Sequence, residues 1–373
     1  MRKEIGLYLH VPFCARKCAY CDFASYAGRE ADMAPYADAV LREMAEKSGC
    51  LDAAVATLYI GGGTPSLLPP KLMERLLSGI RTYFDVLPGA EWSCECNPGT
   101  LTEVFLSVLR NAGVNRLSMG AQAAQPRLLS LLGRIHTWEQ VASSVRLARK
   151  WGFHNLNLDL MLGLPTQTLA DMEETLAAAL SLSPTHLSCY GLIVEEGTAL
   201  HDKISRGEWT LPDEDTERGM YELCRETLAK NGFFQYEISN FSLPGFACRH
   251  NVDCWRRKEY VGLGCAACGF LGSVRYQNPP KLTDYLNGSP PEETVIFPED
   301  ARFESVMLGL RMMEGVSEEA FFQMHGVTLR EVYGEKLQRP IAQGLVEWKN
   351  GFLRLTRRGM DVQNTVLVEL MDD

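Results

Sequence analysis

Short apolar runs alternate with longer amphipathic runs through the first half of the chain. The short runs predict strands at residues 6–10, 56–60, 92–96, 116–120, 155–161 and 186–192. In the longer runs apolar residues recur every three or four positions, which predicts helices at residues 36–47, 70–83, 102–111, 138–151 and 169–182. Strand and helix therefore repeat as units, and this repetition predicts an α/β fold with a parallel sheet.

Periodicity alone leaves two architectures open, a doubly wound sheet and an incomplete barrel. Both architectures place binding sites at the carboxyl ends of the parallel strands. Two unusual loops follow such ends: a cysteine-bearing loop after the first strand, and the turn Gly61-Gly62-Gly63-Thr64-Pro65 after the second. We therefore expect the chemistry of this protein at one rim of the sheet.

Beyond residue 200 the alternation ends, and the sequence predicts a helix at 213–231 followed by an irregular, cysteine-bearing stretch at 235–274. Five prolines between residues 278 and 298 indicate a linker or an ordered loop. A helical run from residue 301, short helices and a hairpin with arms at 346–348 and 352–355 complete the chain. This order is similar to a small winged-helix module, which we expect to pack against the rest of the protein rather than to bind DNA.

The composition is that of a globular protein. The 373 residues are 46% hydrophobic and 23% charged, which excludes disordered, collagen-like and coiled-coil classes. Lys and Arg total 37 against 47 Asp and Glu, and the net charge of −10 disfavours a nucleic-acid partner. The uncharged stretch at 175–194 contains proline, histidine and several hydroxyl residues, so it is not a membrane span. Twelve cysteines at this low density indicate reduced thiols, and we expect a cytoplasmic protein.

Cys14, Cys18 and Cys21 are the most specific chemical signal in the sequence. Three and then two residues separate them, and they follow the first predicted strand. Cysteine thiolates hold iron–sulfur clusters, and a four-iron cluster normally takes four ligands. Three ligands leave one iron open to chelate a small molecule with an amine and a carboxylate, and S-adenosylmethionine is the obvious candidate. A zinc site or incidental thiols are the alternative, although a zinc ribbon needs a second cysteine pair in the same module.

The glycine-rich turn at residues 61–65 has two interpretations. Glycines let the backbone approach a ligand closely, and carbonyls at the end of a strand can accept from the amino group of a bound methionine moiety. A tight connection between strand and helix is the alternative, because such turns are common. Its predicted position at the same rim as the cysteine loop favours a role in ligand binding.

With Tyr20 and Cys21 as an aromatic–cysteine pair, the loop resembles that of the radical S-adenosylmethionine superfamily. Further segments at 8–14, 61–66, 95–100, 118–122 and 157–165 resemble the oxygen-independent coproporphyrinogen oxidase family. Within it the chain is most similar to the haem-chaperone branch, because Asp22-Phe23 stands where the dehydrogenase pattern has glycine and a further cysteine.

The likeness covers residues 5–270 and is looser through the C-terminal module. It implies a partial (β/α)6 TIM-type radical SAM barrel at 1–200, an α+β region at 201–290 and a winged-helix-like module at 300–373.

The resemblance further implies a [4Fe-4S] cluster on the three loop cysteines and a bound S-adenosylmethionine (SAM). Glu95, Gln122 and Asp159 fall at or near the ends of predicted strands, where they can bind ribose hydroxyls or the amino group. Arg134 can pair with the methionine carboxylate or with propionates. Solvated or capping roles are the alternative for each polar residue. The implied SAM pocket consists of Tyr8, Tyr20, Gly62, Gly63, Thr64, Glu95, Gln122, Arg134 and Asp159.

Residues 248–255 are similar to the haem-binding element of the family, in which histidine and asparagine precede an aromatic pair. Two positions depart from that pattern, because Cys254 replaces the tyrosine and Cys268 replaces a histidine further along. Histidine and cysteine both ligate haem iron, and we expect His250 as the axial ligand with Cys254 as the second candidate. Trp255 can stack on a porphyrin, and a core position is its alternative. A structural histidine bonded to backbone is the alternative for His250.

The cysteines of this region suggest a separate possibility. Cys248, Cys254, Cys265 and Cys268 lie within twenty-one residues, and we consider them as ligands of an auxiliary zinc or iron–sulfur site. Buried thiols that pack as small hydrophobic residues are the alternative. Cys94 and Cys96 share one face of a predicted strand, and we expect them in the core.

Three functions from different classes remain. The first is a haem chaperone with a [4Fe-4S] cluster and SAM that delivers haem to respiratory haemoproteins, with homodimerisation expected from the family. The second is a radical enzyme that acts on a tetrapyrrole, such as an oxygen-independent coproporphyrinogen III dehydrogenase. The third is a nonenzymatic protein that uses its thiols for zinc. The set of motifs favours the first, and the residues leave open whether SAM is cleaved.

Overall fold

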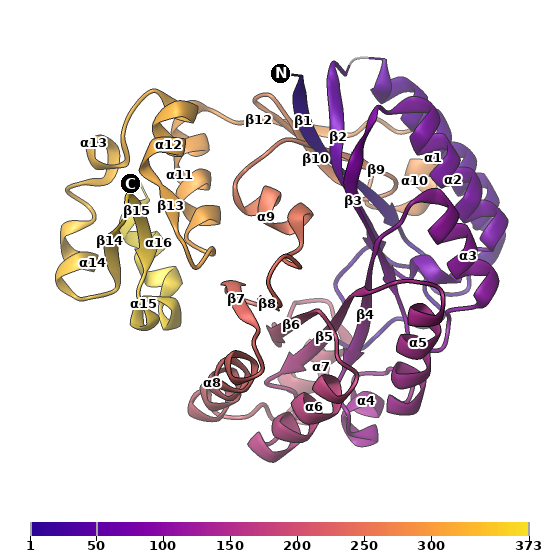
Figure 1. Ribbon diagram of the computed structural model, residues 1–373, viewed down its shortest axis with the longest axis horizontal. Helices are drawn as coiled ribbons and strands as arrows, with labels where there is room; N and C mark the ends of the chain where they lie inside the picture. Colours follow the sequence, from indigo (N-terminus) through magenta and orange to yellow (C-terminus); the bar gives the residue numbers. More distant parts are fainter. Residues whose placement is uncertain (1, 50, 372–373) are drawn as a thin grey trace.

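The parallel strands of the first half lie side by side in chain order. The computed structural model describes residues 2–49 and 51–371, and in it each strand from β1 to β6 pairs in parallel with the next (Figure 1). In a doubly wound sheet the strand order reverses part of the way along the chain. Here β1 to β6 are neighbours in chain order, which excludes the doubly wound sheet and indicates an open, barrel-like arc. The strands are β1 (Lys3–Val11), β2 (Ala53–Gly62), β3 (Val86–Cys96), β4 (Arg116–Gln122), β5 (Asn155–Leu162) and β6 (His186–Gly191).

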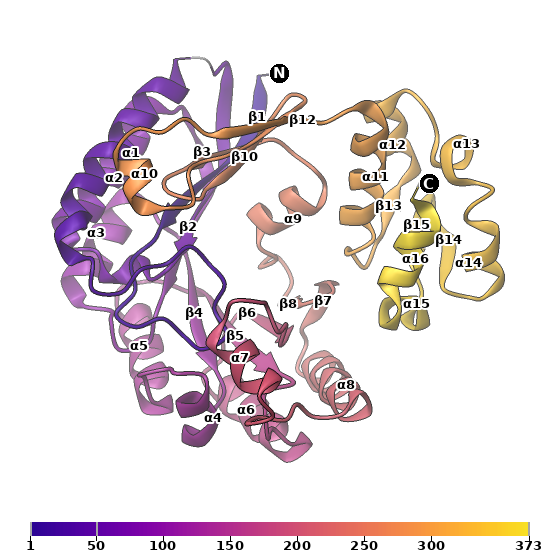
Figure 2. The ribbon, with the colours of Figure 1, turned by 180° about the vertical axis from the view of Figure 1, so that it is seen from behind.

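Helices cover the outer, convex side of this arc (Figures 1 and 2). Their starts follow from local sequence: Thr102 and Thr168 accept hydrogen bonds from backbone N–H groups in the first turns of α3 and α6. The predicted helices are confirmed, and α4 and α7 are additional short ones. The helices are α1 (Met33–Ser48), α2 (Pro70–Tyr83), α3 (Glu103–Ala112), α4 (Pro126–Leu131), α5 (Trp138–Lys150), α6 (Leu169–Ser181) and α7 (Ala199–Ser205), with the short 3-10 helices η1 (Glu30–Asp32) and η2 (Pro65–Leu67) in the loops.

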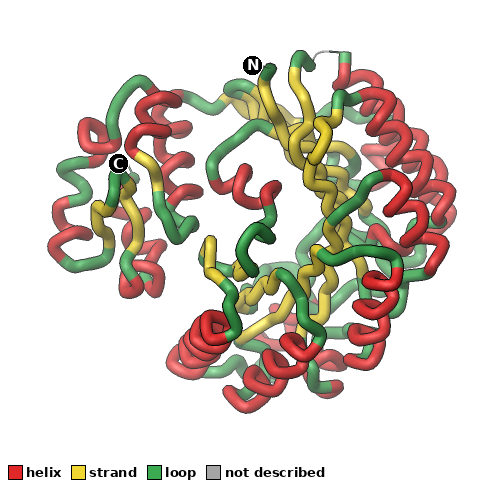
Figure 3. Tube along the Cα trace, in the orientation of Figure 1, coloured by secondary structure: helices red, strands yellow, loops and turns green. Residues whose placement is uncertain are grey.

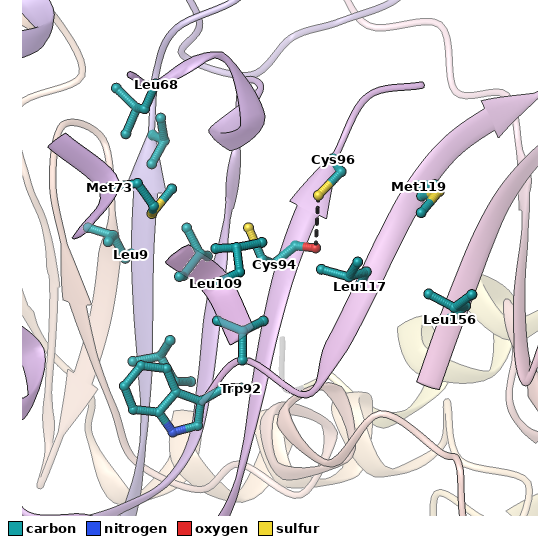
Figure 4. Packing of buried hydrophobic residues seen from close by; sticks show 14 of the residues in the cluster. Leu9, Leu68, Met73, Trp92, Cys94, Cys96, Leu109, Leu117, Met119 and Leu156 are labelled. Atoms are coloured by element: carbon teal, nitrogen blue, oxygen red, sulfur yellow. Dashed lines mark hydrogen bonds between the residues drawn. The ribbon is translucent and has the colours of Figure 1, made fainter. Parts of the chain in front are cut away.

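The two faces of the central strands differ in polarity. Trp92, Leu117 and Leu156 belong to the apolar core that the sheet forms with the helices, and each is at most 2% exposed (Figure 4). Cys94 and Cys96 lie in the same core, as predicted. Successive strand residues point to opposite faces, so the alternate residues point into the arc. These inward residues are polar: Glu91, Ser93, Glu95, Arg116, Ser118, Asn157, Asp159, His186 and Ser188.

Beyond residue 200 the chain adds strands to both edges of this sheet. β9 pairs in parallel with β1, and β8 pairs antiparallel with β6. The expectation of an irregular stretch at 235–274 is therefore wrong, and residues 278–298, expected as a linker or an ordered loop, hold a helix and a strand with ordered connections. The elements are α8 (Glu214–Lys230), β7 (Phe234–Glu237), β8 (Asn240–Ser242), α9 (Arg249–Trp255), β9 (Tyr260–Leu263), β10 (Cys268–Leu271), β11 (Val274–Gln277), α10 (Leu282–Leu286) and β12 (Glu292–Val295).

The C-terminal residues form a separate small module with its own apolar core (Figure 3). The hairpin of β14 and β15 around Asn350-Gly351 is confirmed, and β13 joins it to form an antiparallel sheet. No helix in the described part of the chain is long and apolar enough to cross a bilayer. The elements of the module are α11 (Pro298–Gly309), β13 (Val316–Ser317), α12 (Glu318–His325), α13 (Leu329–Tyr333), α14 (Gln338–Ala342), β14 (Val346–Lys349), β15 (Phe352–Leu355), α15 (Arg357–Asp361) and α16 (Gln363–Leu370).

An ion pair between a half-buried arginine and a fully buried carboxylate joins this module to the barrel. Arg311, just after α11, donates to the Glu237 carboxylate at 3.2 Å, and Glu237 is fully buried. The same carboxylate accepts from the Ser239 backbone N–H at 2.9 Å and from the Asn240 amide at 2.5 Å. Burial raises the pKa of Glu237, while Arg311 opposes that rise. The guanidinium therefore stabilises a charge that burial would otherwise penalise.

We expect Arg311→Ala to lower the free energy of unfolding by about 2 kcal/mol, because it leaves a buried carboxylate without its cation. Adding Glu237→Gln removes that charge and is expected to restore about half of the loss. The raised Glu237 pKa makes the loss larger at pH 8, where the carboxylate is charged, than at pH 5. Denaturant unfolding at the two pH values measures this difference, and equal losses would contradict it.

Candidate functional site

The three loop cysteines lie around one cavity at the carboxyl ends of the strands. The cavity has a volume of about 390 Å³, and Cys14, Cys18 and Cys21 all line it. The Thr64 hydroxyl donates to the Cys14 thiol at 3.6 Å, and Arg134 donates to the Cys18 sulfur at 3.7 Å. The thiols thus meet the glycine-rich turn and the expected ligand-binding arginine at the same rim, as the sequence predicts.

Burial raises the pKa of the Cys14 and Cys21 thiols, so both are protonated at neutral pH in the absence of a metal. Metal ligation requires thiolates, so loading a cluster must release these protons. Within the described residues, no group of His, Cys, Asp and Glu side chains gathers around a position for a single metal ion. A cubane cluster takes one thiolate per iron, and three half-buried thiols around a cavity fit that requirement.

The glycine-rich turn fits against the start of the cysteine loop. The N–H groups of Gly63 and Thr64 donate to the carbonyls of Val11 and Phe13 at 2.8 and 2.7 Å. A Cβ on Gly63 would lie 2.7 Å from the Phe13 carbonyl oxygen, so no larger residue fits there. Gly62 has φ +106°, a conformation that favours glycine. The turn therefore holds the cysteine loop in place as well as lining the cavity.

Two carboxyl groups, Glu95 and Asp159, lie in the same cavity. Glu95 accepts from the Tyr59 hydroxyl at 2.9 Å and from the Gly62 N–H at 3.1 Å. Burial, with a further contribution from the nearby Asp159, raises the pKa of Glu95 to about 7. Burial also raises the pKa of Asp159, against hydrogen bonds that favour its ionised form. Both groups are therefore sensitive to a ligand that brings positive charge or hydroxyl donors.

Arg134 and Gln122 complete the polar lining of the cavity. Arg134 donates to the Gly120 carbonyl at 2.7 Å and to the Asn97 side-chain oxygen at 2.9 Å. Gln122, at the end of β4, has φ +66°, which is uncommon for a residue with a side chain. Fixed by these contacts, the guanidinium is available to an anionic group at the cavity wall.

Most of the expected SAM residues line this cavity, and one does not. Tyr20, Gly62, Gly63, Thr64, Glu95, Gln122, Arg134 and Asp159 are part of the lining. Tyr8 is not part of the lining, and its hydroxyl bonds to His10 Nδ1 at 2.9 Å. Four residues that were not expected from the sequence also line the cavity: Tyr59, Asn97, Ser118 and Tyr190. Tyr59, Ser118 and Tyr190 share the inward-pointing positions of their strands, so strand alternation could have identified them.

The second motif forms the floor of the arc, at the opposite ends of the strands. Glu91, at the start side of β3, accepts from the backbone N–H groups of Arg249 and His250 at 3.0 and 3.1 Å, and from the Cys248 thiol at 3.5 Å. These bonds hold the first turn of α9 against the sheet. In Figure 1, α9 lies between the sheet and the C-terminal module, and it contacts both β2 and α11.

His250 points into the arc rather than into solvent. It is 6% exposed, its Nδ1 bonds to the Thr57 hydroxyl at 3.0 Å, and its ring stacks on Tyr59 at 5.4 Å between centroids. Burial, with the charge of Arg116, lowers the pKa of His250 to about 4, so the imidazole is neutral. Within the described residues Nε2 makes no hydrogen bond. A neutral imidazole with one nitrogen anchored and the other unpaired is suited to metal ligation.

The other residues of this motif are not brought together as a metal site. Cys248 bonds to Glu91, and the Cys265 thiol donates to the carbonyls of Pro279 and Pro280 at 3.3 and 3.4 Å. Burial raises the pKa of Cys254 to about 12. Trp255 lines a cavity of about 260 Å³ between α9 and the C-terminal module, and Arg311 stacks on its ring at 4.4 Å. The structure thus gives the auxiliary-metal hypothesis no support among the residues it describes.

Two family models match separate stretches of the chain. The radical SAM superfamily model matches residues 8–179, and the HemN C-terminal domain model matches residues 296–362. Among solved structures, the chain is similar to coproporphyrinogen III oxidase (HemN) from Escherichia coli, with a TM-score of 0.86. The match covers 99% of this chain and 90% of the HemN chain. Its sequence identity of 23% makes this a likeness of fold.

Curated relatives match along the whole chain, beyond the range of residues 5–270 expected from the motifs. The heme chaperone HemW of Lactococcus lactis is 36% identical, over 100% of this chain and 99% of the relative. HemW of Bacillus subtilis is 35% identical over 96% and 97%, and HemW of Escherichia coli is 33% identical over 97% of each. With its cysteine loop and glycine-rich turn around one cavity, the chain belongs to the HemW family of radical SAM proteins.

Proposed function

We propose that this protein is a haem chaperone. It holds a [4Fe-4S] cluster and SAM in the cavity lined by the loop cysteines, called the upper cavity from here on, and it binds haem through residues 248–255 at α9, called the α9 motif. The observation that supports it best is that three thiols, a glycine turn, two carboxyl groups and an arginine line one cavity. The full-length relatives named as heme chaperones support the same role. A coproporphyrinogen dehydrogenase is disfavoured by Asp22-Phe23 after the cysteine loop.

In the upper cavity, Cys14, Cys18 and Cys21 are the proposed ligands of three irons. The cluster supplies an open iron and an electron for chemistry on SAM. The Glu95 carboxylate accepts from the amino group of SAM, and Asp159 accepts from ribose hydroxyls. Arg134, fixed by Gly120 and Asn97, faces the methionine carboxylate.

On the floor, His250 is the proposed axial ligand of haem through Nε2. Thr57 fixes Nδ1, as the supporting partners of ligating histidines do. His250 is buried, so haem reaches it only when α9 moves away from the sheet. Cys254 lies one helical turn further along α9 and is the second candidate. Trp255 lines a neighbouring cavity together with Met312 and Phe321, where it can stack on a porphyrin.

The proposal includes three domains, a cytoplasmic location and a homodimeric state. Residues 1–200 correspond to a partial (β/α)6 barrel, 201–290 to an α+β region that extends its sheet, and 300–373 to a winged-helix-like module. The module packs through Arg311 rather than binding nucleic acid. We place the protein in the cytoplasm, where thiols stay reduced, as a homodimer that passes haem to respiratory haemoproteins.

Replacing any one of Cys14, Cys18 and Cys21 by serine is expected to reduce bound iron from about four to fewer than about two atoms per chain after anaerobic reconstitution. The cluster absorption disappears with it. Cys268→Ser is the matched control, because that thiol is similarly exposed and lies outside the cavity. Equal iron loss in the control would contradict the assignment of the cluster to the loop.

SAM affinity is expected to depend on the ionisation of Glu95. With a Glu95 pKa of about 7, the carboxylate becomes protonated as the pH falls, so affinity drops about tenfold from pH 8 to pH 6. Glu95→Gln is neutral at both values. Titration of SAM itself affects the wild type and the variant equally, so it drops out of the ratio of their affinities. This ratio, wild type over variant, should fall about tenfold from pH 8 to pH 6. Anaerobic calorimetry measures the ratio, and a constant ratio would rule out this role of Glu95.

Haem titration followed by absorption spectroscopy tests the floor site. His250→Ala is expected to lose the Soret shift, and Thr57→Val to weaken haem binding about tenfold by freeing the imidazole. Cluster absorption serves as the folding control in each variant. A Soret shift that survives in His250→Ala but disappears in Cys254→Ser would transfer the axial role to Cys254, and a wild-type chain that binds no haem would refute the chaperone proposal.

A further inference from the structure

A chain of side-chain hydrogen bonds crosses the interior from the upper cavity to the floor. Asn157 donates to Asp159 Oδ1 at 2.7 Å, and its side-chain oxygen lies 2.6 Å from His186 Nδ1. His186 Nε2 lies 2.8 Å from the Tyr236 hydroxyl. The Tyr236 oxygen in turn accepts from the Cys248 backbone N–H at 3.3 Å, directly before α9.

The direction of every bond in this chain is fixed by its upper end. The Asn157 amide nitrogen faces a carboxylate and the Ser118 hydroxyl, so the amide oxygen must face His186. His186 must then carry its proton on Nδ1 to donate to that oxygen. A neutral imidazole with a proton on Nδ1 has only an acceptor at Nε2, and the Tyr236 hydroxyl must donate to it. All donors therefore point toward Asp159.

The environment keeps His186 in this neutral form. His186 is fully buried, and Asn157 is 1% exposed. Burial and the charge of Arg116 hold the pKa of His186 well below its usual range. The imidazole therefore donates from Nδ1 and accepts at Nε2. A second proton, on Nε2, would prevent the Tyr236 hydroxyl from donating to it.

The two ends of the chain open into different cavities. Asp159 lines the upper cavity, whereas Tyr236 lines a cavity of about 590 Å³ on the floor side, together with Arg249 and Val252 of α9. Packing alone does not require such a connection, since apolar side chains usually fill the inside of a barrel. A continuous chain of hydrogen bonds in which every donor points the same way fixes the orientation of the Asp159 carboxylate at its upper end.

We propose that Tyr236 and His186 are positioning residues, which hold the Asp159 carboxylate in the orientation that binds a hydroxyl-bearing ligand in the upper cavity. The identity of that ligand, the ribose of SAM, rests on the proposed function. Neither residue touches the ligand, and both act through Asn157. Tyr236 also connects this orientation to the backbone at the start of α9.

Tyr236→Phe removes the terminal donor and is expected to weaken SAM binding threefold to tenfold. Tyr221→Phe is the matched control, because its hydroxyl donates to the Ile238 carbonyl at 2.7 Å and has no connection to Asp159. His186→Gln can still donate to Asn157 and accept from Tyr236, so its affinity should stay within about threefold of wild type. His186→Leu breaks the chain and should bind SAM as weakly as Tyr236→Phe or more weakly.

Affinities of the reconstituted full chain are measured by anaerobic calorimetry, with thermal unfolding to match the variants for stability. Tyr236→Phe binding within twofold of Tyr221→Phe, or His186→Gln binding as weakly as His186→Leu, would overturn the proposal.

The tautomer of His186 gives a test that needs no SAM. Nitrogen-15 NMR of histidine-labelled full chain, with the signal assigned by its loss in His186→Gln, should show a neutral imidazole protonated on Nδ1 at pH 6. A proton on Nε2, or a charged ring at that pH, would refute the chain. A wild-type protein with the expected tautomer that fails to bind SAM would contradict the proposed function instead.

Discussion

Polar side chains inside the arc must find partners within the protein, and this requirement organises the structure. One face of each central strand joins the apolar core under the helices, while the other places groups such as His186 and Asn157 where water is scarce. An unpaired polar group there costs free energy. The interior is accordingly linked into networks, from Glu95 through Tyr59 on one side and from Asp159 through Asn157 on the other.

The same requirement explains why the floor is closed by α9. Glu91 is 6% exposed, and three donors from the first residues of α9 satisfy it. The strands at the sheet edges and the ion pair between Glu237 and Arg311 then hold the segments on either side of this helix. A low-dielectric interior bounded by the cavity above and α9 below raises the pKa of Glu95, which prepares it to respond to a cationic ligand.

Sequence patterns predicted the parallel core and the cysteine loop because both signals are local. Short apolar runs that alternate with amphipathic runs, and a three-cysteine spacing, can be identified without knowledge of the distant chain. The strands between residues 234 and 295 escaped prediction, since each has only three or four residues and owes its stability to pairing with β1, β6 and each other. The expected role of Tyr8 stays a prediction, since its hydroxyl bonds to His10 and it is not part of the cavity lining, and Tyr59 was missed although its strand was predicted.

The interior networks also make the two candidate sites energetically dependent on each other. In the haem-bound state proposed above, α9 leaves the sheet, which separates the His250 ring from Tyr59, the residue that donates to Glu95. The same movement withdraws the Cys248 N–H from Tyr236, at the base of the chain that ends at Asp159. In that proposed state, both carboxyl groups of the upper cavity lose part of their support. By thermodynamic reciprocity, a ligand that requires those carboxyl groups in place favours the closed position of α9.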